Sequence, residues 1–405
     1  MIVQRTEYLN FLKRWKDQQV IKVVSGVRRC GKSTLFDLFK ADLRKNGVAE
    51  EQIIAVNFEE LDYENLTDYH QLYAYIKEHL LPDRMNYIFL DEIQHCEGFE
   101  KVVDSLFIKS NCDVYITGSN AYFMSGELAT LLSGRYVELN MLPLSFKEFV
   151  LGLEERNSTL TDRQKFNLYL DYGAFPYLLN FDHFGKDARD YLRSLYNTII
   201  LKDVVARLKV SDVVVLENLS KFMLHNVGNR VSAAKIANTL KSAGKGADQK
   251  TVDKYINGLA DALLLYEATR YNIKGKQFLT TQSKYYAVDI GFRNILVRGT
   301  ESDEGYILEN IVFLELKRRG YDVYVGEVDD GKVDFVAISD GKPTYFQVAA
   351  STLDPTTLSR ELAPFGRIND NYPKYLLTLD EVFASADYEG IMKMNAVDWL
   401  LEKNC

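Results

Sequence analysis

A glycine-rich stretch near the amino terminus constrains the fold of this chain more than any other feature. Residues 26–33 are Gly-Val-Arg-Arg-Cys-Gly-Lys-Ser; the strand-like run Lys22–Val24 precedes them, and Lys32–Lys40 continues with the periodicity of a helix. Gly26 and Gly31 allow backbone conformations that a β-carbon forbids, so N–H groups can point at phosphate oxygens. The amino terminus of the helix adds a partial positive charge. The order strand, glycine-rich turn, helix therefore predicts a phosphate-binding loop.

The positions within this loop have separate expected roles. Lys32 is expected to reach the outer phosphates of a nucleotide, and the Ser33 hydroxyl is expected to ligate Mg²⁺. Arg28 and Arg29 are expected to contact either phosphates or a partner. The alternative, a glycine-rich turn without a ligand, fits the flanking strand and helix less well. The expected nucleotide-binding residues are Gly26, Val27, Arg28, Arg29, Cys30, Gly31, Lys32, Ser33 and Thr34.

Two acidic residues follow a second apolar run. Tyr87–Leu90 leads directly into Asp91 and Glu92. Because parallel strands end at the same edge of a sheet, both carboxylates are expected beside the phosphate loop. Asp91 is expected to hold Mg²⁺, and Glu92 is expected to act as the general base that orients and polarises an attacking water. The alternative is that the two acids cap the next helix.

Polar residues also follow a third apolar run, Val114–Thr117. Ser119 or Asn120 is expected to contact the γ-phosphate or the water, the alternative being a plain turn. Arg135 precedes the next strand-like run and is expected to stabilise transition-state charge in its own chain or in a neighbouring subunit, unless it is an ordinary surface residue. The expected catalytic residues are Lys32, Glu92, Asn120 and Arg135.

Composition and charge exclude several classes of protein. The 405 residues are 47% hydrophobic and 26% charged, as in a globular protein of two or three domains. No apolar run approaches the roughly 18 residues of a membrane helix, and Met1–Gln19 is typical of an amphipathic helix rather than a signal peptide. The four cysteines lack C-x-x-C spacing and the five histidines are scattered, so neither disulfides nor a zinc site are expected. The expected location is the cytoplasm.

A basic segment lies in the middle of the chain. The net charge is −8, yet residues 230–260 carry six Lys or Arg against two Asp. Predicted helices at Val231–Leu240 and Lys250–Leu259, followed by a hairpin of Leu263–Ala268 with Phe278–Thr281, form the pattern of a winged helix-turn-helix. The expected nucleic-acid contacts are Lys250, Thr251 and Lys254. The alternative is that the segment serves as a lid or a protein-interaction surface.

The last part of the chain, from a predicted helix at Tyr306–Arg319 through three predicted strands, resembles the core of restriction endonucleases. The positions that match the metal-binding and catalytic residues of active members are Glu309, Asp334, Gln347 and Ala349. Gln is a poorer ligand for a hard dication than an acid, and Ala supplies no charge to a scissile phosphate. These positions are therefore degenerate, and a binding module is expected rather than a nuclease, unless Lys332 or Lys374 replaces the missing lysine in space.

Taken together, the motifs resemble the prokaryotic AAA-like family of P-loop ATPases with a C-terminal domain of unknown function. The chain lacks the N-K-x-D motif of GTPases. The motifs that carry the resemblance are GVRRCGKST, FLDEIQ, ITGSN, SGRYVEL, LPLSFKEF, GAFP, KYYAVDIGFRN, LEN, VDFV and FQVA. The implied domains are residues 1–145 (AAA-like P-loop ATPase core), 146–228 (helical lid region), 229–300 (winged helix) and 301–405 (nuclease-like domain).

The predicted fold class is therefore α/β, with a P-loop NTPase parallel sheet, a helical plus winged-helix middle and a restriction-endonuclease-like C-terminal module. The predicted function is binding and hydrolysis of ATP, with Mg²⁺, in a protein whose nucleotide state positions the other modules on DNA. The alternatives are a low-turnover nucleotide-gated scaffold that binds DNA or protein, and an ATP-dependent nuclease. A homo-oligomer is compatible with a trans-acting Arg135, and no membrane association is expected.

Overall fold

The computed structural model describes residues 2–119, 132, 134–156, 158–210, 212–242, 247–297, 304–329 and 331–403. The chain forms two compact units. Unit 1 is Met1–Pro143 with Asp261–Leu263, and unit 2 is Leu144–Ala260 with Leu264–Cys405. None of the helices in the described ranges is long and apolar enough to cross a bilayer. The predicted division into four domains stays a prediction.

Unit 1 is built on a five-stranded sheet in which all neighbouring strands are parallel, in the order β2-β3-β4-β1-β5. Its elements are α1 (Thr6–Trp15), β1 (Ile21–Ser25), α2 (Lys32–Lys45), β2 (Ile53–Asn57), α3 (Tyr69–His79), β3 (Asn86–Asp91), α4 (Phe99–Phe107), β4 (Cys112–Gly118) and β5 (Tyr136–Asn140). The predicted parallel sheet and the helix after the glycine-rich loop are confirmed.

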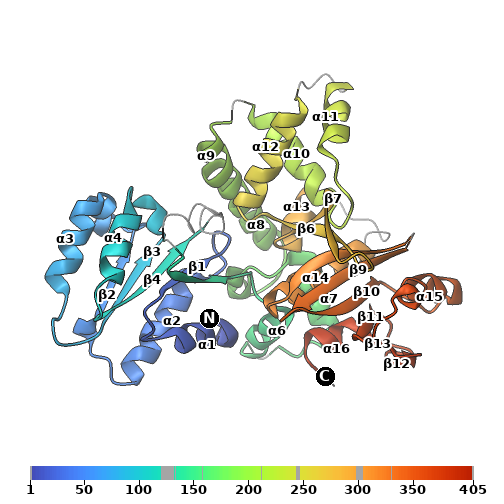
Figure 1. Ribbon diagram of the computed structural model, residues 1–405, viewed down its shortest axis with the longest axis horizontal. Helices are drawn as coiled ribbons and strands as arrows, with labels where there is room; N and C mark the ends of the chain where they lie inside the picture. The colour runs from blue at the N-terminus through green and yellow to red at the C-terminus, as the bar shows by residue number, and fades with distance from the viewer. Residues whose placement is uncertain are drawn as a thin grey trace. The chain divides into compact units, whose positions relative to one another are not determined.

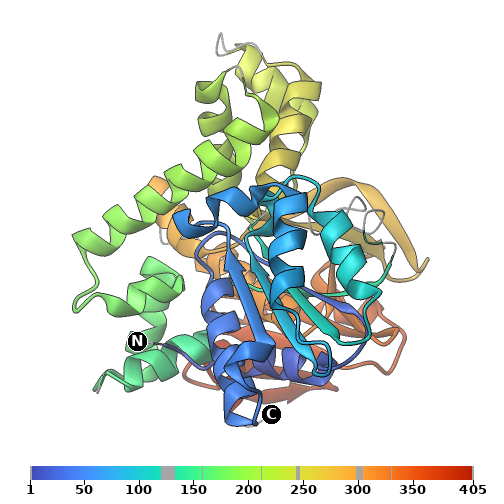
Figure 2. The ribbon, with the colours of Figure 1, turned by 90° about the vertical axis from the view of Figure 1, so that its left-hand side faces the viewer.

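Helices cover both faces of this sheet because successive strand residues point to opposite sides. On one face, Ile88 of β3 packs in a cluster with Leu72 of α3 and residues of α4. On the other face, Phe89 of β3 meets Phe36 of α2, with ring centroids 5.1 Å apart. Figure 1 shows α3 and α4 on one side of the sheet and α1 and α2 on the other, and Figure 2 turns this unit towards the viewer. The central strands β1, β3 and β4 are therefore buried on both faces.

Lys22 and Asp113 form an ion pair inside unit 1. Their side chains are 0% and 1% exposed. Asp113 also accepts hydrogen bonds from the hydroxyl of Tyr115 at 2.8 Å and from the N–H of Asp17 at 2.9 Å. Lys22→Met leaves this carboxylate buried without its cation, so we expect unit 1 to lose about 3–5 kcal/mol of stability.

Tryptophan fluorescence can isolate this effect because the chain has two tryptophans. Trp15 lies in unit 1 and Trp399 in unit 2, so urea unfolding in a Trp399→Phe background follows unit 1. The double variant Lys22→Met/Asp113→Asn removes both charges and should regain at least half of the loss. An unchanged unfolding midpoint in Lys22→Met would contradict the expectation.

Unit 2 combines helices with a mixed sheet of eight strands. Its helices are α6 (Phe146–Glu154), α7 (Asp162–Tyr172), α8 (Lys186–Thr198), α9 (Ala206–Leu208), α10 (Val213–His225), α11 (Ala233–Ser242), α12 (Gln249–Asp261), α13 (Ile290–Leu296), α14 (Glu304–Arg318), α15 (Pro355–Leu362) and α16 (Ala396–Leu400). Its strands are β6 (Leu265–Asn272), β7 (Gln277–Ala287), β8 (Asp322–Val328), β9 (Gly331–Ser339), β10 (Lys342–Ala349), β11 (Lys374–Thr378), β12 (Ala386–Tyr388) and β13 (Ile391–Asn395). The helical middle and the C-terminal sheet are as predicted.

The β6–β7 hairpin belongs to the same sheet as the C-terminal strands. The strand order is β12-β13-β11-β10-β9-β8-β6-β7, and β6 pairs in parallel with β8 from Arg270 to Asn272. The two predicted helices before the hairpin are α11 and α12, and Val252, Ile256 and Leu259 of α12 are buried as expected. This order of elements is compatible with a winged helix, which stays a prediction.

A buried carboxylate explains the glycine of the GAFP motif. Asp289 accepts hydrogen bonds from the N–H of Ala174 at 2.6 Å and of Gly291 at 2.8 Å. Gly173 has a φ of +75°, and a β-carbon there would lie 1.8 Å from a carboxylate oxygen of Asp289. Only glycine fits this close approach. The motif leads into the short 3₁₀ helix Pro176–Asn180, and its hydrogen bond to Asp289 ties it to the start of α13. The motif therefore has a structural role.

Candidate functional site

The carboxyl edge of the parallel sheet in unit 1 gathers Lys32, Asp91 and Glu92, three of the polar residues predicted from the sequence. The glycine-rich loop follows β1, Asp91 ends β3, and β4 lies between these two strands. Thr117, near the end of β4, is therefore placed between the loop and the acids. Its hydroxyl donates to Asp91 and accepts the N–H of Glu92 at 2.8 Å. The sheet thus brings three chain segments to one place.

The loop backbone has the features that a phosphate cradle needs. A β-carbon on Gly26 would lie 2.4 Å from the carbonyl oxygen of Met141, so the loop passes too close to the chain after β5 for a side chain. Gly31 has a φ of +107° at the N-cap of α2, and Arg29 has a φ of +67°. Left-handed conformations at such positions are typical of anion-binding loops, in which successive N–H groups converge on the ligand. The α2 amino terminus adds its partial charge.

Lys32 and Glu92 form a buried ion pair at the centre of the site. The ammonium lies 3.1 Å from Oε1 of Glu92 and donates to the carbonyl of Gly26 at 3.0 Å. The two side chains are 3% and 8% exposed. Burial would lower the pKa of Lys32, but the Glu92 carboxylate outweighs it and raises the pKa. The ammonium is thus held as a cation where outer phosphates are expected.

Glu92 is held in an unusual state. Burial alone would raise the pKa of Glu92, but Lys32, together with hydrogen bonds from Gln94 and Ser119, lowers it to about 2. Its backbone is left-handed, with a φ of +55°, and such strain in a non-glycine residue is typical of functional sites. The residue precedes the short helix Ile93–His95, yet its side chain forms no capping hydrogen bond. Helix capping therefore does not explain this acid.

Asp91 presents the oxygen donors that Mg²⁺ prefers. Burial raises the pKa of Asp91, while hydrogen bonds with the hydroxyls of Ser33 and Thr117 oppose this shift. A cavity of about 260 Å³ lies against Ser33, Asp91 and Asn57. The described residues contain no group of three or more His, Cys, Asp or Glu side chains arranged around a metal. Mg²⁺ at phosphate sites needs only one or two carboxylates besides phosphate and water, so the residues fit it.

Other predicted loop residues surround this centre. Val27 and Cys30 are fully buried, and Arg29 is exposed. Arg28 is bonded to Glu59 at 2.7 Å. Thr34 lies in the first turn of α2, half-buried. Their part in nucleotide binding stays a prediction.

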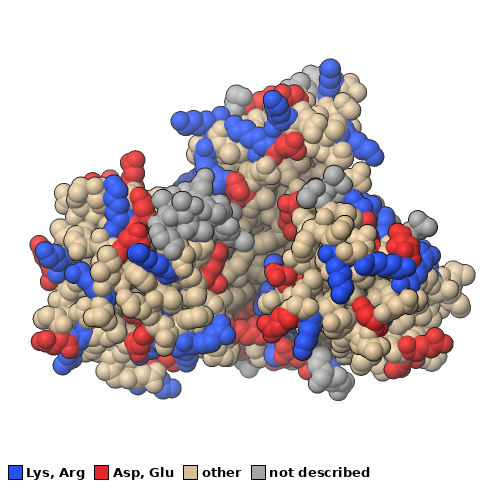
Figure 3. All heavy atoms as spheres, viewed as in Figure 1, with Lys and Arg blue, Asp and Glu red and all other residues tan. Residues whose placement is uncertain are grey.

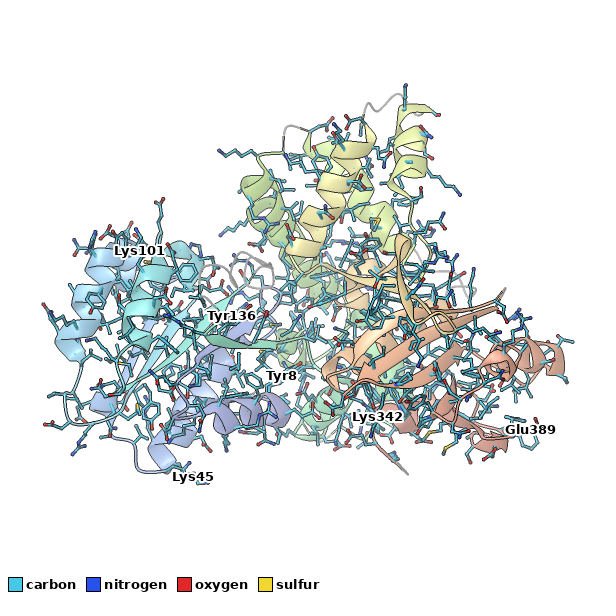
Figure 4. All side chains as sticks on the ribbon, viewed as in Figure 1. Tyr8, Lys45, Lys101, Tyr136, Lys342 and Glu389 are labelled. Carbon is cyan, nitrogen blue, oxygen red and sulfur yellow. The ribbon has the colours of Figure 1, made fainter. Side chains whose placement is uncertain are left out.

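Arg135 lies at the other edge of the sheet. Its carbonyl accepts the N–H of Ile21, the first residue of β1, whereas the glycine-rich loop follows the last residue of β1. Tyr136, labelled in Figure 4, marks this start of β5. The Arg135 side chain is 45% exposed, 3.9 Å from Asp104 and stacked on Phe107. Because the strands are parallel, this placement does not suit action on the loop of its own chain, and action in trans stays a prediction. Asn120 lies outside the described residues.

Sequence reasoning missed Arg5, which supports the loop from behind. Arg5 is 4% exposed and donates to the carbonyls of Cys30 at 3.2 Å and Leu142 at 2.8 Å. Its guanidinium stacks on Tyr8 of α1, labelled in Figure 4. An arginine can bridge several carbonyls at once because its donors form a rigid fork. No local pattern marks this role, since the two acceptors are 25 and 137 residues away. Gln94, which holds Glu92, follows the acidic pair by two positions and was also missed.

The residues predicted to touch nucleic acid lie on α12 in unit 2. Lys250 and Lys254 are exposed, and the Lys254 ammonium donates to the carbonyl of Leu208 at 3.0 Å. Thr251 is half-buried, and its N–H donates to Asp248. In Figure 3, Lys and Arg side chains stand out from the helices at the top of the view, with acidic side chains between them. The nucleic-acid contacts of these residues stay a prediction.

The degenerate nuclease positions meet in a second place in unit 2. Glu309 of α14 and Asp334 of β9 share the ammonium of Lys284, at 2.7 Å and 3.9 Å. Gln347 of β10 accepts the N–H of Asp334 at 3.2 Å. The lysine that pairs with the two acids is therefore Lys284 of β7, whereas Lys332 and Lys374 were the alternatives offered by the sequence. It was missed because β7 precedes the predicted module in the chain.

Comparisons with known proteins agree with this architecture. Residues 18–150 match the sequence model of an AAA domain, and residues 163–303 match a domain of unknown function, DUF8612. An uncharacterized protein of Haemophilus influenzae is 39% identical over 403 residues, which are 99% of each chain. The uncharacterized protein MJ1544 of Methanocaldococcus jannaschii is 29% identical over 357 residues, 85% of this chain and 78% of that one.

Among solved structures, the Walker-type ATPase PABY2304 of Pyrococcus abyssi is similar over 73% of this chain and 96% of its own, with 16% identity and a TM-score of 0.48. The identity over the full length of the Haemophilus influenzae protein establishes kinship. The chain therefore belongs to the same family as that Haemophilus influenzae protein and carries an AAA domain over residues 18–150.

Proposed function

We propose that this protein binds ATP with Mg²⁺ in the glycine-rich loop of unit 1 and hydrolyses it to ADP and phosphate. The buried Lys32–Glu92 pair at the carboxyl edge of the AAA domain carries the proposal most directly. Two opposite charges held out of water are costly unless they serve each other or a ligand. Here the cation lies on a loop suited to phosphates, and the anion is the residue expected to act on water.

Each residue of the site has a separate role in the proposed reaction. Loop N–H groups and Lys32 hold the phosphates, while the hydroxyl of Ser33 and the carboxylate of Asp91 would hold Mg²⁺. Mg²⁺ held there would supply charge neutralisation of the phosphate oxygens. Glu92 orients a water for in-line attack on the γ-phosphorus and receives its proton. Water oxygen forms the new bond to phosphorus as the bond to the ADP oxygen breaks.

The ion pair also leads us to expect slow turnover without a further signal. A carboxylate with a pKa of about 2 is a weak base. Phosphates compete with Glu92 for Lys32, and as Lys32 moves towards them the pKa of Glu92 rises. Binding of ATP thus activates the base by removing its cation. Gln94 and Ser119 keep the carboxylate in place meanwhile.

We further propose that the nucleotide state governs unit 2, which acts on DNA. Support comes from the α11–α12 helices with the β6–β7 hairpin and from the basic residues of α12. The rival is a scaffold that binds nucleotide with little turnover. No nuclease activity is proposed, because Gln347 and Ala349 replace the expected acid and lysine.

Steady-state phosphate release with and without DNA separates the two functions. We expect the rate to rise when DNA is added, because a switch that acts on DNA couples the two ligands reciprocally. Lys250→Gln/Lys254→Gln should reduce the stimulation by DNA and leave the basal rate unchanged. Lys221→Gln, at another exposed lysine, is the control and should leave both rates unchanged. Turnover that DNA does not change would contradict the proposed action on DNA, and absence of any turnover would favour the scaffold.

A further inference from the structure

A large cavity lies in unit 2 at the end of β10. Its volume is about 790 Å³, and its walls come from α14, β9, β10, α15 and the segment after α15. Figure 1 shows α15 beside this end of the sheet. All of these elements belong to one compact unit. The cavity is thus formed within unit 2.

The floor of the cavity is charged but largely balanced. Lys284 bridges Glu309 and Asp334, and the hydroxyl of Tyr286 also donates to Glu309. The ammonium of Lys284 therefore offsets part of the negative charge that Glu309 and Asp334 would present to an anion in the cavity.

Gln347 completes the floor, and both polar ends of its side chain form hydrogen bonds within the protein. Its amide oxygen accepts the N–H of Asp334 at 3.2 Å, and its amide nitrogen donates to Glu361 at 2.7 Å. Both ends of the amide are therefore occupied. Together with the lysine between Glu309 and Asp334, this arrangement favours a ligand held by cations at the rim over a metal held by the floor.

The rim supplies those cations. Lys332, Arg360 and Arg367 line the cavity and are exposed. Arg360 is paired with Glu361 at 2.9 Å. Within the described ranges, neither Lys332 nor Arg367 forms an ion pair. Two cations at the mouth of a cavity that have no ion-pair partner in the described part of the chain are suited to successive phosphates of a polyanion.

An aromatic ring adjoins the same cavity. Tyr306, near the start of α14, lines it and is 41% exposed. Exposed aromatic rings beside cationic grooves stack unpaired bases, and stacking requires that the bases are not already paired in a duplex. The combination of ring and rim cations therefore distinguishes a single strand from a duplex or a free phosphate.

We propose that this cavity binds single-stranded nucleic acid, with Lys332 and Arg367 on backbone phosphates and Tyr306 stacked on a base. The inference rests on the proposed action of unit 2 on nucleic acid. It assigns that action to this cavity and to the single-stranded form. It does not depend on ATP turnover. Binding of single-stranded nucleic acid can therefore be measured without ATP, and a negative result there is distinct from a negative result for phosphate release.

Fluorescence anisotropy of the full chain with labelled oligothymidylate and oligouridylate tests the proposal and shows whether DNA or RNA is preferred. We expect at least one of them to bind tighter than a duplex of the same length. Lys332→Gln/Arg367→Gln should make the slope of log K against log salt shallower by about 1.4, at about 0.7 per lost phosphate contact. Tyr306→Ala should lower affinity about tenfold and leave the salt slope unchanged.

The matched control is Lys342→Gln/Lys186→Gln, which removes two exposed positive charges elsewhere in unit 2. Lys342, labelled in Figure 4, begins β10, the strand whose other end lines the cavity. The control should bind like the unchanged chain. The proposal would be overturned if a duplex bound as tightly as a single strand. It would also be overturned if the control variant lost as much affinity as Lys332→Gln/Arg367→Gln, or if free phosphate displaced the oligonucleotide at the same concentration of phosphate charge.

Discussion

The Glu92→Gln variant is expected to hydrolyse ATP about 10²–10³-fold more slowly than the unchanged chain, because a positioned general base contributes on that order. Gln keeps the shape of the side chain and its contacts with Gln94 and Ser119, but it cannot accept the proton of water. Phosphate release under steady-state conditions measures the loss. Glu78→Gln, on the exposed surface of α3, makes the same chemical change away from the site and should leave turnover unchanged.

The same variant should bind ADP and ATP more tightly. In the unchanged chain the phosphates compete with Glu92 for Lys32, which lies 3.1 Å from the carboxylate. Loss of this charge frees Lys32 and removes a buried anion near the phosphates. Equilibrium titration with ADP isolates the effect, because ADP cannot be hydrolysed at this site. Weaker ADP binding in Glu92→Gln would contradict the idea that the ion pair opposes nucleotide binding.

The second large effect is expected for Lys32→Met, which should abolish measurable nucleotide binding. The variant loses the only cation that the structure places against both Gly26 and Glu92 among the described residues. It also leaves Glu92 buried without a partner, so we expect unit 1 to lose about 3–5 kcal/mol of stability. The fluorescence of Trp15 in the Trp399→Phe background reports this loss.

The double variant Lys32→Met/Glu92→Gln separates folding from binding. Removing both charges should restore most of the stability while nucleotide binding stays absent. Recovery of binding together with stability would mean that Lys32 acts only through the fold, and it would contradict the assigned role.

The stability lost in Lys32→Met should also depend on pH. Lys32 and its neighbours lower the pKa of Glu92 from 4.5 to about 2 in the folded chain. A lowered folded-state pKa contributes stability above the unfolded value and loses it as pH falls towards the folded value. The difference between Lys32→Met and the unchanged chain is therefore largest above pH 4.5 and shrinks on acidification towards pH 2. Urea unfolding across this range measures the difference.

Local patterns in the sequence were enough to predict the AAA-type core. The glycine-rich loop, the apolar strands and the acids after β3 depend on short stretches of chain, and a parallel sheet places the ends of its strands at one edge. The same rule also contained the signal that Arg135 was misplaced for action in cis. A residue that precedes its strand lies at the amino edge of the sheet, opposite the phosphate loop.

The contacts that tune the sites could not be predicted, because they join distant parts of the chain. Arg5 reaches Leu142 across 137 positions, and Lys284 reaches Glu309 from a strand assigned to a different module. The Lys32–Glu92 pair combined two residues that were each predicted, but with separate roles. Sequence periodicity reports which face of an element is buried, whereas such pairings depend on how strands and helices pack.

The decisive experiment first measures binding of a fluorescent ATP analogue to the unchanged chain and to Glu92→Gln, and then compares phosphate release by the two proteins. Both proteins are expected to bind the nucleotide with Mg²⁺, and only the unchanged chain is expected to release phosphate at an appreciable rate. Equal phosphate release by both proteins, or failure of the unchanged chain to bind ATP, would contradict the assignment of an ATP-hydrolysing site to this loop.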